Sequence, residues 1–190
     1  CYCLTVEPKT ALDHFVKTGK AQPVNEEQSA HQFEMLMKAM KQNDYEHYEI
    51  SNFAKPGWYS RHNSSYWKGA KYLGLGPSAH SFDNTSRQWN VANNAQYLKR
   101  INKQDTALFY EKEILSPEQQ YNEYVMTSLR TIWGCDLKKV KGLGAQFESH
   151  FLKTVQQFID NEVVVCRDGV FLLTQKGKLL ADQVAMELFC

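Results

Sequence analysis

The ten residues SRHNSSYWKG, Ser60–Gly69, carry a set of side chains that neither helix nor strand patterning requires. Imidazole is the usual axial ligand of haem iron, tyrosine and tryptophan offer flat apolar faces with polar edges, and the planar fork of arginine matches a propionate. Arg61, His62, Asn63, Tyr66 and Trp67 together would suit a porphyrin or another flat, anionic ligand. On residue types alone we favour a structural interpretation, in which the two large rings fill the wall of a barrel and the imidazole and amide hydrogen-bond to neighbouring backbone.

A second candidate site is the glycine-rich bend Gly74–Ala79, which matches the pattern G-x-G-x-x-A. A dinucleotide fingerprint needs a following helix whose free amides meet a pyrophosphate. Pro77 removes one amide and no helical pattern follows, so we predict no nicotinamide site. The glycines instead permit close backbone approach to a ligand or to a neighbouring strand. His80 follows directly, beyond the end of a predicted strand, where barrel enzymes gather their sites; a packed structural histidine is an equal alternative.

The first residues offer two further candidates. Glu7 ends the first predicted strand, where its carboxylate can accept hydrogen bonds from a ribose or an ammonium group, or can be a solvated charge before a helix. Cys1 and Cys3 alternate along that strand. They can be half of a metal site, but free cysteine usually behaves as a small apolar residue, which favours one face of a buried strand.

The composition excludes several classes of protein. A net charge of +1 and a pI near 7.8 give no global field for nucleic acid or an acidic membrane. No apolar run is long enough to span a bilayer, and no signal segment is visible. Five cysteines at irregular spacing argue against a disulfide framework and predict a reducing, cytoplasmic setting. The chain opens without methionine, so we expect a piece of a longer protein.

The first part of the chain predicts alternating strands and helices, the order of a βα barrel or a doubly wound sheet. A loop with a short turn is expected to carry the Ser60–Gly69 stretch. The expected strands and helices are a strand at Tyr2–Val6, helices at Thr10–Thr18 and after Asn25, strands at Tyr45–Phe53, Tyr72–Leu75 and Ser86–Val91, and a helix at Asn93–Asn102.

The second part predicts three helices, a hairpin and a last helix, in a winged-helix-like α+β arrangement. The expected elements are helices at Ser116–Ile132, Asp136–Val140 and Gln146–Asn161, a hairpin about Asp168-Gly169, and a helix at Gln175–Phe189 capped by Thr174. A winged helix suggests DNA, but the third helix carries Glu148 and Asp160 against Lys153 alone, so we predict no nucleic-acid binding. The domain boundary is expected near Ala107–Ser116, giving domains 1–107 and 108–190.

Three segments carry a family resemblance: LTVEPKTAL, YEHYEISNFAKPGWYSRHNSSYWKGAKYLGLGPSAHSF and LLTQKGKLLAD. Together they resemble the later half of the oxygen-independent coproporphyrinogen III oxidase-like family, and more closely its haem chaperone branch (HemW-type radical S-adenosylmethionine proteins). The resemblance implies an α/β fold: the last strands and helices of a radical S-adenosylmethionine (β/α) barrel, then a small winged-helix-like domain.

The resemblance also implies roles for named residues. S-adenosylmethionine would lie near Thr5, Glu7 and His80. The stretch His62-Asn63-x-x-Tyr66-Trp67 matches the haem-associated signature of the chaperone branch. His62 is then the expected axial iron ligand, with Arg61, Asn63, Tyr66 and Trp67 around the macrocycle, which reverses the preference for a structural interpretation.

The chain departs from the family in one respect. The cluster motif C-x-x-x-C-x-x-C is absent, and Cys1 and Cys3 fall on a much later strand. The parent would use a 4Fe-4S cluster, S-adenosylmethionine and haem, whereas this chain alone is expected to be catalytically inactive and can lack every one of these cofactors. Half a barrel also leaves strand edges unpaired, which favours a homodimer or poor order.

Three functions follow as hypotheses. The first is a haem chaperone that binds haem and transfers it to acceptor proteins. The second is an oxygen-independent coproporphyrinogen III oxidase, which decarboxylates propionates oxidatively in porphyrin biosynthesis. The third is an interaction or DNA-binding module built on the C-terminal domain. The His-Asn-x-x-Tyr-Trp signature favours the first.

Overall fold

The computed structural model describes residues 4–102 and 110–190. The chain divides into two compact units, and the boundary in the sequence falls between Tyr59 and Ser60. The predicted domain boundary at 107/108 lies outside the described residues and stays a prediction. Most of the predicted first strand, with Cys1 and Cys3, is also outside them, and Leu4–Val6 has no regular structure.

The first unit contains the two helices that the sequence predicts. In each, a polar side chain before the first turn accepts a backbone N–H that has no partner within the helix. Thr10 Oγ1 accepts from Asp13 N, and Asn25 Oδ1 accepts from Gln28 N at 2.9 Å. The long helix buries Met37, whereas the first buries no residue. These helices are α1, Ala11–Lys17, and α2, Glu26–Gln42.

The predicted strand Tyr45–Phe53 is wrong as a single element, because the chain turns back within it. β1, Glu46–Glu49, pairs antiparallel with β2, Asn52–Ala54. The Glu49 carboxylate, 2% exposed, accepts the Ser51 backbone N–H at 3.1 Å and the Asn52 side-chain amide, and so closes the turn. The motif Glu-Ile-Ser-Asn-Phe is therefore a hairpin held by a buried carboxylate.

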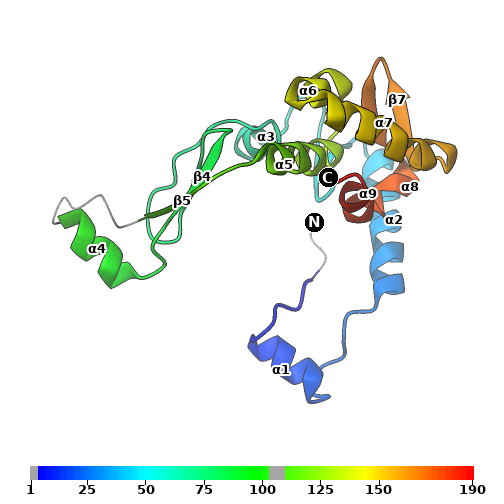
Figure 1. The fold of residues 1–190 in the computed structure, drawn as a ribbon. Helices are drawn as coiled ribbons and strands as arrows, with labels where there is room; N and C mark the ends of the chain where they lie inside the picture. The colour runs from blue at the N-terminus through cyan, green and yellow to red at the C-terminus, as the bar shows by residue number, and fades with distance from the viewer. Residues whose placement is uncertain (1–3, 103–109) are drawn as a thin grey trace. The chain divides into compact units, whose positions relative to one another are not determined.

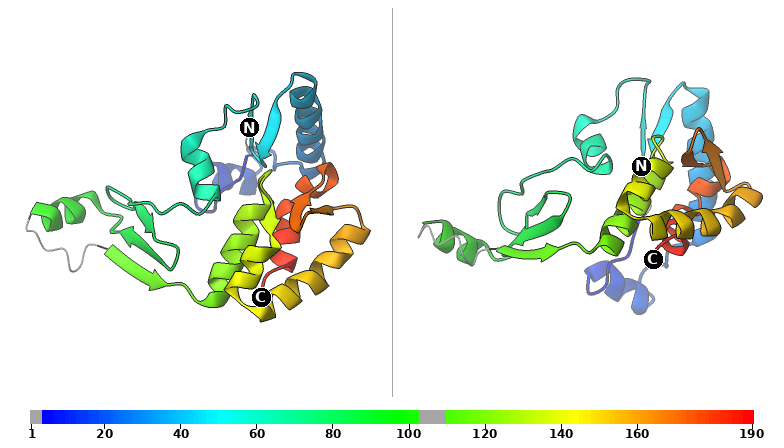
Figure 2. Two further views of the ribbon diagram at one scale, coloured as in Figure 1. Left: turned by 90° about the horizontal axis from the view of Figure 1, so that it is seen from above. Right: turned by 45° about the horizontal axis from the view of Figure 1, so that its top comes forward.

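The second unit begins with a helix, an antiparallel meander and a further helix (Figure 1). β4 is confirmed as predicted, whereas the predicted strand Tyr72–Leu75 reduces to one bridge between Tyr72 and Phe82. Two unpredicted strands flank β4 on either side in the order β3-β4-β5, and Figure 2 shows β4 and β5 running side by side. These elements are α3, Arg61–Trp67, β3, His80–Phe82, β4, Ser86–Asn90, α4, Asn94–Asn102, and β5, Tyr110–Ile114.

The glycine-rich bend Gly74–Ala79 packs against this meander. A Cβ on Gly74 would lie 2.2 Å from the His80 carbonyl oxygen, so only glycine allows the backbone to run this close to β3. The buried amide of Asn90 donates to the carbonyl oxygens of Gly74 at 3.2 Å and Gly76 at 2.9 Å. The Tyr97 hydroxyl accepts the Gly76 N–H at 3.1 Å. The close approach expected from the sequence is thus to a neighbouring strand.

The remaining elements form a packed helical cluster around a small sheet with strand order β6-β8-β7 (Figure 1). The predicted helices and the hairpin are confirmed, but the predicted last helix, Gln175–Phe189, is broken at Leu179–Leu180. The cluster contains α5, Pro117–Leu129, β6, Cys135–Asp136, α6, Leu137–Leu143, α7, Ala145–Asp160, β7, Val164–Arg167, β8, Val170–Leu173, α8, Gln175–Lys178, and α9, Ala181–Glu187.

Aromatic packing centres this cluster. The Tyr121 ring stacks on Phe147 with centroids 4.8 Å apart, and Phe151 meets Phe171 edge-on at 4.9 Å. The Tyr121 hydroxyl, carried into the core by that ring, donates to the Leu188 carbonyl at 2.8 Å. A buried tyrosine hydroxyl needs such a partner, and here the bond ties α5 to the last turn of the chain.

The fold class is α/β, as expected, whereas the barrel assignment is not confirmed and stays a prediction. Every strand pair in the described ranges is antiparallel, so the parallel pairs of a βα barrel do not occur there. The winged-helix assignment stays a prediction. Among residues 4–102 and 110–190, no helix is both long and apolar enough to span a membrane.

The tight contact under α8 gives a test of this packing. A Cβ on Gly177 would lie 2.0 Å from the Val163 carbonyl oxygen, whereas one on Gly142 in α6 would meet nothing within 4 Å. Gly177→Ala is expected to destabilise the chain by about 1–3 kcal/mol through overpacking, and Gly142→Ala to stabilise it by up to about 1 kcal/mol through helix propensity. Urea unfolding followed by circular dichroism measures both, and equal effects would contradict the packing described.

Candidate functional site

The Ser60–Gly69 stretch is a helix, α3, and the prediction of a loop is wrong. Ser60 Oγ caps its start by accepting the Asn63 N–H at 3.2 Å. Gly69, at φ +69°, ends it: the Gly69 N–H donates to the Tyr66 carbonyl and the Ala70 N–H to the Ser65 carbonyl. This pair of bonds is a Schellman motif, which needs a left-handed residue at this place. The cap and the glycine together define a helix of about two turns.

Helical spacing sorts the candidate residues onto separate faces, because residues four apart lie one above the other. His62 and Tyr66 form one such pair, with ring centroids 4.9 Å apart and planes at 90°. Both side chains are exposed, Tyr66 by 43%. Within the described part of the chain, neither imidazole nitrogen of His62 has a hydrogen-bond partner. The imidazole is therefore free to bind a ligand.

A row of rings continues from this pair. Tyr66 meets the Tyr72 ring edge-on at 4.8 Å, and Tyr72 lies 5.9 Å from the Phe82 ring on β3. Desolvation by burial raises the pKa of Tyr72, so its phenol stays neutral at physiological pH. The row gives a continuous apolar aromatic surface that begins at His62.

The second face of α3 carries Asn63 and Trp67. The Trp67 ring lies under the Arg130 guanidinium at 5.5 Å, and Arg130 also pairs with Asp182 at 2.5 Å. Asn63 Oδ1 and the hydroxyl of Ser64 are buried without a hydrogen-bond partner in the described residues. Trp67 is thus half-buried against the C-terminal cluster, which differs from the barrel wall expected from the sequence.

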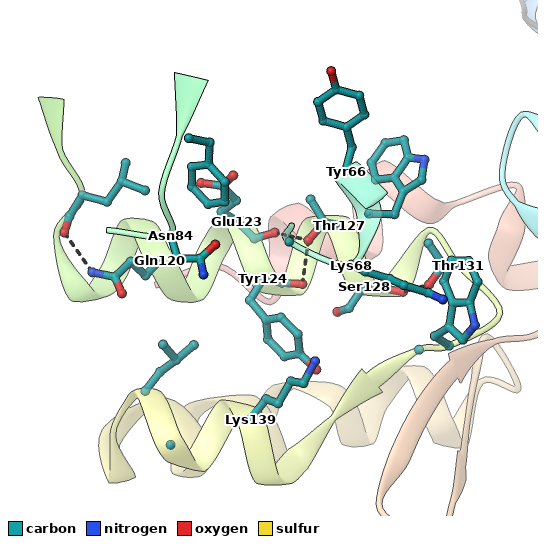
Figure 3. Close-up of a pocket in the computed structure, with 18 of the residues that line it drawn as sticks. Tyr66, Lys68, Asn84, Gln120, Glu123, Tyr124, Thr127, Ser128, Thr131 and Lys139 are labelled. Carbon is teal, nitrogen blue, oxygen red and sulfur yellow. Dashed lines mark hydrogen bonds between the residues drawn. The ribbon is translucent and has the colours of Figure 1, made fainter. Parts of the chain in front are cut away.

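A pocket of about 500 Å³ opens between the end of α3, the β3–β4 meander and helices α5 and α6 (Figure 3). This volume is ordinary for a small-molecule site. Aromatic rings and the polar side of α5 form most of its wall. The lining includes Tyr66, Trp67, Lys68, Tyr72, Phe82, Glu123, Tyr124, Thr127, Ser128, Thr131, Trp133 and Lys139.

Tyr66 and Trp67, which the sequence predicts to contact a macrocycle, both lie in this wall, whereas the residues on its α5 and α6 side were not predicted. The signal was present: Gln120, Glu123 and Thr127 repeat at helical spacing along α5, and Thr131, just beyond its end, continues this polar stripe. Such a stripe is typical of a solvated face as well, so it indicates a pocket only once the opposite wall is known. His62, Arg61 and Asn63 do not line the pocket.

The other predicted ligand residues lie elsewhere. His80 begins β3, is exposed, and has its ring 6.1 Å from Trp89 on β4. Thr5 and Glu7 belong to the first unit, where both are exposed before α1. The Glu7 carbonyl accepts the Thr10 hydroxyl at 2.7 Å. The role of these three residues at S-adenosylmethionine stays a prediction.

The thiols within the described ranges do not fit an iron–sulfur cluster. No group of three or more His, Cys, Asp or Glu side chains in those ranges could hold a metal ion. Cys135 is buried, while Cys166 is exposed on β7 and Cys190 is exposed after α9. Burial raises the pKa of the Cys135 thiol to about 12. These three thiols therefore do not form an iron–sulfur cluster site.

Comparison with known proteins identifies the relatives. Residues 115–180 match the HemN C-terminal domain family. The chain is 29% identical to heme chaperone HemW of Bacillus subtilis over 96% of its length and 48% of that protein. It is likewise 29% identical to heme chaperone HemW of Mycobacterium tuberculosis H37Rv, over 98% of this chain and 46% of that protein. The family resemblance is confirmed.

The chain spans about half the length of these curated relatives. A further relative, the mitochondrial radical S-adenosyl methionine domain-containing protein 1 of Danio rerio, is 37% identical over 42% of this chain and 18% of that protein. Coproporphyrinogen III oxidase (HemN) of Escherichia coli, described as a radical SAM enzyme, superimposes with a TM-score of 0.60 over 97% of this chain and 42% of that one. At 19% identity this likeness shows a shared fold alone.

The reactivity of the Cys135 thiol gives a test of its burial in the C-terminal cluster. With a pKa near 12, only about one Cys135 in ten thousand is a thiolate at pH 8, and the thiolate is the reactive form. Iodoacetamide is therefore expected to alkylate Cys166 in the folded chain and to spare Cys135 until urea is added. Peptide mass spectrometry reads both residues in one sample. Alkylation of Cys135 at the rate of Cys166 would contradict the burial described.

Proposed function

We propose that this chain carries the haem-binding part of a haem chaperone, with His62 as the axial ligand of the iron. One observation carries the proposal: His62 is an exposed imidazole with no hydrogen-bond partner among the described residues, at the end of a row of aromatic rings. A buried structural histidine satisfies its nitrogens in the protein, whereas His62 is exposed. This one leaves them open to a ligand.

The orientation of Tyr66 supports the same role. The plane of an axial imidazole contains the bond to iron, so it stands upright on the porphyrin plane. The Tyr66 ring is at 90° to the imidazole, which allows it to lie parallel to a macrocycle bound there and to stack on it. Trp67 holds α3 against the C-terminal cluster through Arg130. Arg61 is exposed beside His62, in place to meet a propionate, and Asn63 completes the first turn.

The remaining roles extend from the relatives. The whole protein would use a 4Fe-4S cluster and S-adenosylmethionine, with Thr5, Glu7 and His80 near the latter. It would act in the cytoplasm and deliver haem to acceptor proteins, and a homodimer would cover unpaired strand edges. Coproporphyrinogen III oxidase activity is the second candidate, favoured by the match of residues 115–180 to the HemN C-terminal domain family. Anaerobic turnover of coproporphyrinogen III by the whole protein would rank it first.

A matched pair of histidine variants tests the iron ligand. Removing second-shell partners of a metal ligand costs about 10- to 100-fold in affinity, so removing the ligand itself by His62→Ala is expected to weaken haem binding by at least about tenfold. Titration with haem followed at the Soret band measures this. His14→Ala, which removes an exposed histidine beside an aromatic ring and far from α3 in the sequence, is expected to leave the band unchanged. An unchanged spectrum in the His62 variant would show that His62 is not the iron ligand.

A further inference from the structure

The pocket beside α3 has walls suited to a flat apolar ligand. Six aromatic residues line it, of which Tyr66 also contacts His62 and so joins the pocket to the imidazole face. The members of this aromatic wall are Tyr66, Trp67, Tyr72, Phe82, Tyr124 and Trp133. Flat rings on several sides favour a ligand with extended planar faces.

Two positive charges stand at this pocket, one on each side. Lys68, at the end of α3, places Nζ 4.0 Å from the centroid of Trp133. Lys139, on α6, places Nζ 5.6 Å from the centroid of Tyr124, and Figure 3 shows it extending toward that ring. Neither ammonium group has a carboxylate partner among the described residues. Each ammonium lies near an aromatic ring and has hydrogen-bond donors left for an anion.

The α5 wall offers no such attraction. The hydroxyls of Thr127 and Thr131 donate their protons to backbone carbonyls of α5 at 2.7 and 2.9 Å, as Ser128 does at 3.3 Å, so these groups present lone pairs. Glu123 on the same wall is negative, and its charge is met by Arg87 on β4 at 2.5 Å. Because the Glu123 charge is neutralised and the hydroxyls of α5 present lone pairs, a carboxylate entering the pocket finds no donor on α5 and is attracted to the two lysines.

The lining holds no good ligand for iron. No His, Cys or Met belongs to it. A tyrosinate can bind ferric iron, but burial raises the pKa of Tyr124 and of Tyr72, so both phenols stay protonated. Whatever this pocket binds, it recognises the organic part of the ligand.

We propose that this pocket binds one edge of a planar tetrapyrrole dicarboxylate independently of its metal, with the two carboxylates on Lys68 and Lys139. The inference rests on the proposed function and deepens it. His62 coordinates the iron, and the pocket binds the macrocycle and the carboxylates on its edge. The chain then also binds the metal-free tetrapyrrole, which the imidazole alone cannot do.

Metal-free protoporphyrin IX is the probe that separates the pocket from the iron ligand. Porphyrin fluorescence, titrated with the chain, gives the affinity. Lys68→Gln and Lys139→Gln are each expected to weaken binding about two- to fivefold, and the double variant about tenfold. The exposed neighbours outside the lining, Lys71 and Lys138, are the matched controls, and Gln at either is expected to change nothing. His62→Ala is expected to leave protoporphyrin binding intact.

The outcomes divide clearly. Protoporphyrin dimethyl ester, which lacks the negative charges, is expected to bind more weakly and to lose its sensitivity to the lysines. Equal losses at Lys138 and Lys139, or tighter binding of adenosine monophosphate than of protoporphyrin, would overturn the pocket assignment. Haem binding that needs His62 while protoporphyrin does not bind defeats this inference and leaves the proposed function standing. If protoporphyrin binds through the lysines but haem binding does not change in the His62 variant, the pocket assignment stands and the iron-ligand assignment is wrong.

Discussion

The capping of α3 is the constraint on which the candidate site depends. Ser60 satisfies the first turn and Gly69 closes the last, so the helix between them has room for about two turns. In so short a helix, residues three or four apart lie on one face, and this sequence places both pairs of site residues four apart. His62 is thereby paired with Tyr66, and Asn63 with Trp67. One face remains open, while the other anchors the helix to the C-terminal cluster through Arg130.

The parts around α3 are fixed by close backbone approaches and by one ion pair. Gly74 lets the chain run against β3, and Asn90 locks that bend. Arg87 on β4 reaches Glu123 on α5 at 2.5 Å and lies 5.7 Å from the Phe82 ring. The same guanidinium therefore neutralises the acidic wall of the pocket and supports its aromatic side. An exposed ion pair alone contributes little to stability, but this one sets the charge that a ligand meets.

The sequence predicted those elements whose signals are local. Ser116-Pro117 begins a helix, Asp168-Gly169 makes a hairpin, and Asn25 caps α2, because each depends on a few neighbouring groups. The hairpin at Glu49 was missed because alternating aromatic residues resemble one strand, and only a buried carboxylate reveals the turn. α3 was missed because Ser, Asn, Tyr and Trp are mediocre helix formers, and its cap and its glycine outweigh propensity.

The candidate site divides in the same way. The four residues of the His-Asn-x-x-Tyr-Trp signature, and Arg61 beside them, could be named from the sequence because they lie within one short stretch. The pocket could not be predicted, since its walls come from α3, the β3–β4 meander, α5 and α6, which are far apart in the chain. Polar residues along α5 and a lysine on α6 look solvated until folding places aromatic rings opposite them. Sequence reasoning finds a ligand's local contacts and misses the enclosing surface.

The proposed function, delivery of haem, would require the protein to release what it binds, and an exposed site is consistent with release. The imidazole is exposed, the lysines are exposed, and their pairing with carboxylates would be the weak kind found at surfaces. Affinity would come from several modest contacts on one flat ligand, made on two connected surfaces that share Tyr66. An acceptor can displace such contacts one at a time, iron ligand first or acidic edge first. A fully enclosed haem pocket would bind more tightly and would have to open before transfer. The open face of α3 therefore fits exchange better than storage.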